Sequence, residues 1–231
     1  MIINLTHIFK YPLVQIINMQ TVDFVNFLIE KHMPVFSLVD AEKILRKKRG
    51  YSTLFIHRCI NKGYIGRVER GLYYVKERHN EYEIASHIVS PSYVSMVSAL
   101  AYYGLTTQIP RIVYVISTKR HKTIKGVAGF DIVFRKIKKE MLFGYRKEDD
   151  GNIFIAEPEK ALVDIYYFND INDMDSSVLE RPSRIDINKL VSYAARSKKK
   201  SVIAGITILL KEYGYMVQAR KLVALVQKSK V

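Results

Sequence analysis

The chain has 231 residues, of which 48% are hydrophobic, so it is long enough to bury one large core or two modest ones. Its 37 Lys and Arg against 22 Asp and Glu give a formal net charge of +15 and a pI near 9.7. This excess is larger than solubility requires and favours a polyanionic partner, either nucleic acid or an anionic membrane surface. The single cysteine, Cys59, excludes an intramolecular disulfide and suits a reducing cytosol, so we expect a cytoplasmic protein.

No stretch of the sequence approaches the roughly 18 to 20 apolar residues of a membrane-spanning helix. The longest apolar run, Ser201 to Leu210, is flanked by lysines at both ends. We therefore interpret it as a buried amphipathic helix. The last predicted helix, with Arg220, Lys221, Lys228 and Lys230, partly fits a membrane-surface helix, but its apolar residues are few enough to be satisfied by packing, so we expect no membrane partner.

Residues 21–75 predict three helices followed by a β-hairpin. Helical spacing of apolar residues covers 21–31, and Ser37 with Asp40 has the spacing of a capping box for a helix that ends in the basic run 46–49 before Gly50. A third helix is predicted from Ser52, as its N-cap, to Gly63. Its core face holds Phe55, Ile56, Cys59 and Ile60, while Thr53, Leu54, His57, Arg58 and Asn61 face the other way.

The runs 64–68 and 71–75 then predict two short strands, and three helices followed by a hairpin is the order of a winged-helix domain. We expect this domain at residues 1–79, with 1–17 as an N-terminal extension. Residues 1–79 hold 13 Lys and Arg against 6 Asp and Glu. A helix fits the DNA major groove, and basic side chains nearby contact phosphates. The predicted DNA-binding residues are Ser52, Thr53, His57, Arg58 and Asn61 on the helix, and Lys47, Lys48, Arg49, Arg67 and Arg70 around it. A dimerisation or scaffolding element is the alternative interpretation.

The remainder of the chain predicts a mixed α/β domain over 80–170 and a helical region over 171–231 that packs on it, which makes the whole an α+β protein. A helix at 82–89 precedes a Ser90 to Ser92 start signal and a helix at 93–104. Strands are predicted at 111–117, 130–137 and 152–156. The loop between the first two strands is basic and could bind phosphate or an acidic partner surface through Lys119, Arg120, His121 and Lys122.

A further helix is predicted to begin at Pro158, where Glu157 and Glu159 suit the positive end of the helix dipole. An acidic, turn-rich linker follows at 169–184. Three more helices are predicted at 187–196, 201–214 and 217–230.

Over residues 20–170 the chain resembles the AbiEi family of antitoxins from type IV toxin-antitoxin systems. Four segments carry the resemblance: "RGLYYV", "YVSMVSALAYYGL", "IVYVISTKR" paired with "GFDIVFRKI", and "IAEPEKALVDIYYF". The resemblance implies a winged-helix domain that represses its own promoter, a second domain that counteracts a nucleotidyltransferase-like toxin, and no enzymatic activity. A stand-alone regulator without a toxin is the alternative, and a homodimer would recognise repeated half-sites.

An enzyme is the third class of function that the sequence permits. Asp131, Glu157, Glu159 and Lys160 superficially match the carboxylates and lysine of a metal-dependent nuclease. In that pattern the second acid and the lysine lie two residues apart on one strand, whereas Glu159 and Lys160 are adjacent. Because the sequence also lacks a Walker-type glycine loop and histidines at i and i+4, we expect no enzyme, no metal and no cofactor.

Overall fold

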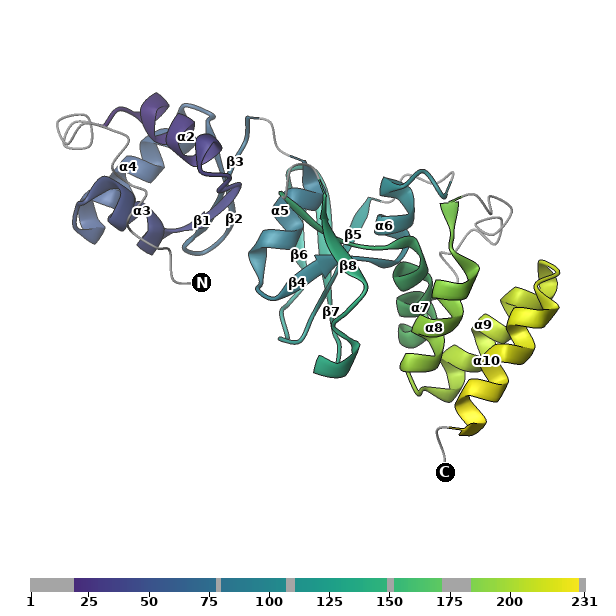
Figure 1. Ribbon diagram of the computed structural model, residues 1–231. Coiled ribbons are helices and arrows are strands. Elements are labelled where there is room, and N and C mark those ends of the chain that lie inside the picture. Colours follow the sequence, from purple (N-terminus) through teal and green to yellow (C-terminus); the bar gives the residue numbers. More distant parts are fainter. Residues whose placement is uncertain (1–18, 78–79, 107–110, 149–151, 172–183, 229–231) are drawn as a thin grey trace. The chain divides into compact units, whose positions relative to one another are not determined.

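The computed structural model describes residues 19–77, 80–106, 111–148, 152–171 and 184–228. The chain forms two compact units, Met1–Asn80 and Glu81–Val231 (Figure 1). Both units combine helices with a sheet, so the chain is an α+β protein. The predicted extension 1–17 and most of the linker 169–184 lie outside the described residues.

The described part of the first unit consists of helices and a three-stranded antiparallel sheet with the strand order β1-β3-β2. Strands β2 and β3 form a hairpin, and β1 pairs with the other edge of β3. In chain order the elements are α2 (Thr21–Glu30), β1 (Val35–Ser37), α3 (Leu38–Leu45), α4 (Arg49–Asn61), β2 (Ile65–Glu69) and β3 (Leu72–Val75).

Aromatic rings join the helices of the first unit to its sheet. The Phe24 ring of α2 makes edge contacts with Phe36 of β1 and Phe55 of α4, with ring centroids 5.6 and 5.4 Å apart. All three side chains are almost fully buried. Full burial of one such side chain stabilises a protein by about 1.5 to 3 kcal/mol, so this cluster fixes α4 against the rest of the unit.

The β2–β3 hairpin depends on a glycine at one position. Gly66 pairs with Tyr74 across the two strands, and the Tyr74 ring lies over it. A Cβ atom at position 66 would approach Tyr74 Cε1 to 2.1 Å, which no side chain tolerates. Glycine at position 66 therefore leaves the space in which the Tyr74 ring packs against β2.

Two helix boundaries in the first unit differ from the prediction. The capping box is confirmed, since the Ser37 hydroxyl accepts from the Asp40 amide and the Asp40 carboxylate accepts from the Ser37 amide. However, α3 ends at Leu45 because Arg46 has a left-handed conformation, with a φ of 52°. Helix α4 begins at Arg49 with Lys48 as its N-cap, so the prediction that Ser52 caps this helix is wrong. Gly50 lies within α4, where its sequence context had indicated a helix stop.

The second unit contains a six-stranded mixed sheet with the strand order β6-β7-β5-β4-β9-β8. Strands β5 and β7 run parallel to each other, and β4 pairs antiparallel to β5 and parallel to β9. The strands are β4 (Ser92–Val94), β5 (Ile112–Ser117), β6 (Ile124–Val127), β7 (Phe130–Lys136), β8 (Tyr145–Glu148) and β9 (Ile153–Ala156).

Helices cover this sheet and form a separate layer toward the C-terminus (Figure 1). Helix α7 is central, since it packs against α6, α8 and α9, while α10 packs against α8 and α9. Among the described residues, no helix has the length and apolar character that crossing a membrane requires. The helices and the 3-10 turn η2 are α5 (Glu81–Ile88), α6 (Met96–Tyr102), η2 (Lys139–Met141), α7 (Pro158–Phe168), α8 (Ile187–Arg196), α9 (Lys200–Glu212) and α10 (Met216–Lys228).

The three strands predicted for this region are confirmed as β5, β7 and β9. The predicted helix start at Ser90 to Ser92 is wrong, because Ser92 begins β4 and α6 starts only at Met96. Part of the segment predicted as a basic loop is strand β6. The sequence did not indicate β4, β6 or β8 because each spans only three or four residues, which is too short for apolar spacing to identify a strand.

Candidate nucleic-acid interface

Helix α4 has one buried face and one exposed face. Phe55, Ile56 and Cys59 are buried as predicted, and Ile60 is half-buried. The exposed face carries Tyr51, Thr53, Leu54, His57, Arg58 and Asn61. Side chains three or four residues apart lie next to one another on a helix, so this face is one continuous surface.

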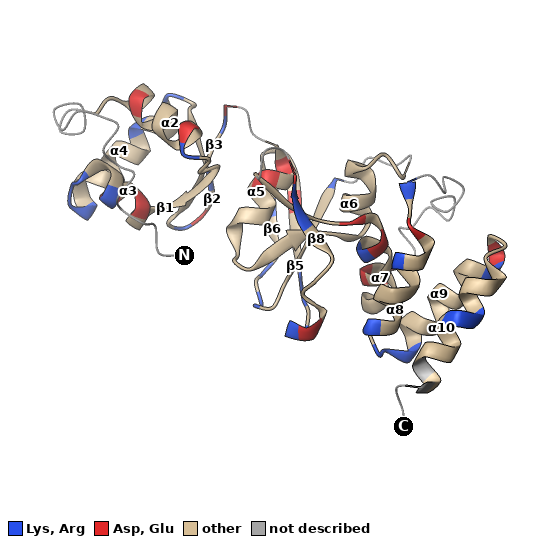
Figure 2. Cartoon of the chain, in the orientation of Figure 1, with Lys and Arg blue, Asp and Glu red and all other residues tan. Residues whose placement is uncertain are grey.

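The N-terminus of α4 is strongly basic. Arg46, Lys47 and Lys48, which lie between α3 and α4, and Arg49, the first residue of α4, are all exposed. Figure 2 shows Lys and Arg in blue at this end of α4. No acidic residue lies in the first turn of α4, and its N-cap makes no side-chain hydrogen bond. Cations at the positive end of a helix dipole weaken the helix, whereas the exposed amides and the cations together attract an anion. The N-terminus of α4 is therefore suited to binding a phosphate group.

Aromatic rings lie close to two cations of this region, Arg58 and Lys47. The guanidinium of Arg58 lies 5.9 Å from the Tyr51 ring centroid and 5.7 Å from that of Phe55, and Lys47 Nζ lies 5.7 Å from the Tyr51 ring. The Tyr51 and Phe55 rings are stacked. Such contacts contribute about 0.5 to 1 kcal/mol each at exposed sites. These contacts favour a position of the Arg58 guanidinium against the surface of α4.

The remaining predicted residues of α4 differ in their surroundings. Asn61 Nδ2 lies 3.3 Å from His57 Nδ1, so these exposed side chains form a pair one helical turn apart. The Thr53 hydroxyl donates a hydrogen bond to the Arg49 carbonyl. Ser52 is fully buried, and its hydroxyl is 3.4 Å from the Lys47 carbonyl, so it does not belong to the exposed face.

The two arginines predicted on the hairpin are exposed. Arg67 lies on β2 and its Nε donates to the Glu69 carbonyl at 3.3 Å. Arg70 lies in the turn between β2 and β3, next to Gly71, which has a φ of 82°. The Leu38 amide donates to the Gly71 carbonyl, so α3 holds the hairpin turn.

Cys59 is not available for chemistry. It lies on the buried face of α4, and burial raises the pKa of its thiol to about 11 despite the opposing charges of Lys62 and Arg58. A thiol with so high a pKa is a poor nucleophile at neutral pH.

In the second unit, the basic loop predicted between the first two strands follows β5. Lys119, Arg120 and Lys122 are exposed there, and His121 is half-buried with its ring 4.6 Å from that of Phe134.

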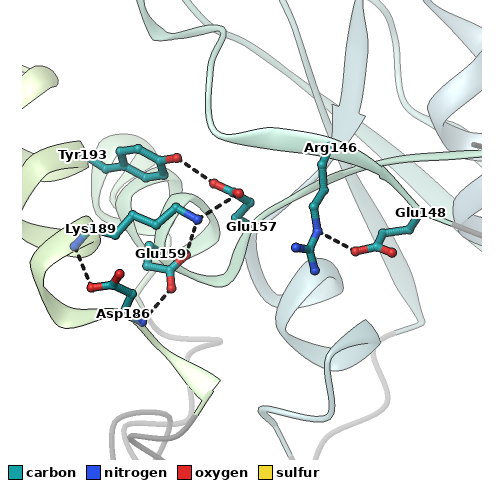
Figure 3. A network of polar contacts seen from close by, with 7 residues as sticks. All are labelled: Arg146, Glu148, Glu157, Glu159, Asp186, Lys189 and Tyr193. Carbon is teal, nitrogen blue, oxygen red and sulfur yellow. Dashed lines mark hydrogen bonds and ion pairs between the residues drawn. The ribbon is translucent and has the colours of Figure 1, made fainter.

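The N-terminus of α7 carries a connected cluster of polar side chains (Figure 3). Glu157 accepts from Tyr193 Oη at 2.6 Å and from Lys189 Nζ at 2.8 Å, and Glu159 accepts from the Asp186 amide at 2.7 Å. Burial alone would raise the pKa of Glu157, but the hydrogen bonds from Lys189 and Tyr193 lower it below its usual value. A cavity of about 370 Å³ lies beside this cluster, lined by Tyr103, Arg146, Glu157, Pro158, Glu159, Arg184 and Lys189. Because Glu157 binds two residues of α8 and Glu159 binds the N-cap of α8, the cluster joins α7 to α8.

Deeper in α7, Lys160 and Asp164 form an ion pair with no exposed side-chain surface. Asp164 also accepts from Ser95 Oγ at 2.8 Å and from Tyr93 Oη at 3.1 Å. Burial lowers the pKa of Lys160 and raises that of Asp164, and their mutual attraction opposes both shifts. The sequence pattern did not indicate this pair.

The residues of the nuclease alternative have other roles in the described structure. Lys160 pairs with Asp164, Glu157 and Glu159 join α7 to α8, and Asp131 accepts from the Gly126 amide. Among the described residues, no group of three or more His, Cys, Asp or Glu side chains could hold a metal ion.

No protein-family model matches the chain, and no curated protein matches it.

Proposed function

We propose that the chain is a sequence-specific DNA-binding transcriptional regulator that acts through a winged helix in its first unit. The observation that carries the proposal is the exposed face of α4 together with the basic run 46–49 at its N-terminus. The chain order of three helices and a hairpin supports it, as do the exposed arginines on that hairpin.

In this proposal α4 lies in the major groove, where its exposed face supplies specificity and its basic N-terminus supplies affinity. Arg58 donates in a bidentate manner to a guanine, and the His57–Asn61 pair contacts a neighbouring base edge. Lys47, Lys48, Arg49 and the amides at the α4 N-terminus contact phosphates, which fixes the position of the helix. Arg67 and Arg70 contact the backbone or the narrow minor groove.

Repression would follow from occupation of a promoter, with the chain's own promoter as the first candidate, and it needs no catalytic step. A homodimer would require two half-sites about one helical turn apart.

The test is binding of the purified chain to a fragment from upstream of its own gene and to an unrelated duplex of equal length, across a salt series. We expect a preference of about 10³-fold or more for the native fragment. Arg58→Ala should reduce that preference by about 1 to 3 kcal/mol, while Arg70→Ala should weaken both duplexes alike and reduce the salt slope by about one.

Two further variants separate base reading from charge. Arg58→Lys keeps the charge but loses the planar fork, so it should retain binding to the unrelated duplex and lose the preference. Lys211→Ala removes an exposed charge from α9, and it should change neither the binding to the unrelated duplex nor the preference for the native fragment. Equal binding of both duplexes by the unaltered chain would refute the proposal.

A nucleotidyltransferase-like toxin as protein partner is proposed from the resemblance alone. The segment "IAEPEKALVDIYYF", which contributes to that resemblance, forms β9 and α7, and most of its side chains are buried. A toxin would therefore have to contact other residues, and it should co-purify with the chain when the two are co-expressed.

A further inference from the structure

The positive charge of the chain is not confined to the first unit. Residues 80–231 hold 24 Lys and Arg against 16 Asp and Glu. Within them, residues 118–139 hold eight Lys and Arg, and Asp131 is the only acid. One of the eight, Arg135, pairs with Asp170 at 2.8 Å.

The fold brings two parts of this segment together at one edge of the sheet. Strands β5 and β7 are parallel, with Ser117 paired to Lys136, so their carboxyl ends lie side by side. The chain after β5 carries Lys119, Arg120 and Lys122, and the end of β7 with the residues after it carries Lys136, Lys138 and Lys139. All six side chains are exposed. We refer to these six residues as the basic edge.

Hydrogen bonds to Ser117 and two buried side chains hold the backbone of the basic edge. The Ile137 amide donates to the Ser117 carbonyl at 2.9 Å, and the Lys119 amide donates to Ser117 Oγ at 3.1 Å. Ile137 and Met141 are buried and anchor the chain that follows β7. These contacts fix the backbone at Lys119 and around Ile137, which lowers the entropic cost of binding a polyanion there.

The composition of the basic edge favours nucleic acid over a protein partner. Among the described residues of 111–148, no large hydrophobic side chain is strongly exposed. Protein interfaces are depleted in lysine and centre on buried aromatic or apolar residues. A surface of lysines and one arginine without such an anchor matches the phosphate backbone instead.

We propose that the basic edge is a second DNA-contacting surface, which binds the phosphate backbone without reading sequence. It rests on the proposed function, because it would add affinity and non-specific association to the specificity that α4 supplies.

The test uses the full chain with two triple variants, Lys119→Gln/Arg120→Gln/Lys122→Gln and Lys136→Gln/Lys138→Gln/Lys139→Gln. Each should weaken binding to the native fragment and to the unrelated duplex by the same factor. The slope of log affinity against log salt concentration should become shallower by about 0.9 for each phosphate that the variant no longer neutralises. The ratio of the two affinities should stay unchanged.

The matched control is Lys198→Gln/Lys200→Gln/Lys211→Gln, which removes the same charge from exposed positions on the second unit. If this control and the basic-edge variants change the slope equally, the basic edge is not a contact surface. A weakening confined to the native fragment also overturns the proposal. If the unaltered chain shows no preference but the slope still falls only in the basic-edge variants, the specific regulator fails while the basic edge stands.

Discussion

Leu54 exposes 66% of its surface on the face of α4 that also carries Arg58. A single exposed leucine is common on protein surfaces, but this one lies close to the basic N-terminus of its helix, which disfavours an apolar protein partner. In the major groove, the one apolar group that identifies a base is the thymine methyl. If α4 enters that groove, Leu54 is placed to contact such a methyl.

We therefore predict that replacing one thymine of the bound sequence with deoxyuridine, which removes only the methyl, weakens binding about fourfold. This corresponds to the roughly 0.8 kcal/mol of one buried methyl-sized group. Leu54→Ala should weaken binding to the thymine-containing fragment and lose sensitivity to the replacement. Competition binding on a set of single replacements measures this. Ile208→Ala, at an exposed position of α9, should keep the wild-type pattern, and uniform tolerance of deoxyuridine by the unaltered chain would contradict the prediction.

At the scale of elements, helices were predictable where apolar spacing and local caps agree. Ser37 and Asp40 form the capping box that their spacing indicates, and Pro158 begins α7. Local signals failed at Gly50, which resembles a helix stop after four basic residues but lies inside α4. The consequence is functional, since the basic run belongs to the N-terminus of α4 rather than to the C-terminus of α3.

The basic edge shows the same limit for the candidate sites. Lys119, Arg120, His121 and Lys122 stand out in the sequence as one run. Lys136, Lys138 and Lys139 join the run only because β5 and β7 pair in parallel, and nothing local specifies that pairing. Burial is equally non-local, which is why Ser52 was predicted as a DNA contact and the buried pair of Lys160 and Asp164 was not predicted.

The junction of α7 and α8 gives a prediction about pH. Because the pKa of Glu157 is lowered, its carboxylate stabilises the fold above its unfolded pKa of about 4.3. That contribution disappears as the pH falls through the lowered folded value. Glu157→Gln should therefore reduce the free energy of unfolding by about 1 kcal/mol at pH 7, and the difference from the unaltered chain should shrink below pH about 4. Urea unfolding at a series of pH values measures it.

Glu140→Gln is the matched control, since Glu140 is exposed on η2 and should show little difference at any pH. A Glu157→Gln deficit that stays constant down to acidic pH would show that the carboxylate charge is not what stabilises the junction.

On the scale of the whole molecule, each unit has its own hydrophobic core. The core of the first unit is built from residues between Met19 and Val75, and that of the second surrounds α7. Each unit also contains one position where a small change has a large structural effect. These are Gly66, beneath the Tyr74 ring, and Asp164, the counter-ion of buried Lys160.

We predict that the two units unfold in separate thermal transitions that single substitutions move independently. Gly66→Ala overpacks the hairpin by about 1 to 3 kcal/mol, so it should lower only the transition of the first unit, by several degrees. Asp164→Asn leaves Lys160 buried without its counter-ion, which costs about 3 to 5 kcal/mol, and should lower only the other transition. Differential scanning calorimetry of both variants at one scan rate measures whether the two transitions move independently. If either substitution moves both transitions together, the two cores fold as one cooperative unit, and the DNA binding proposed for α4 would then be coupled to the state of the second unit.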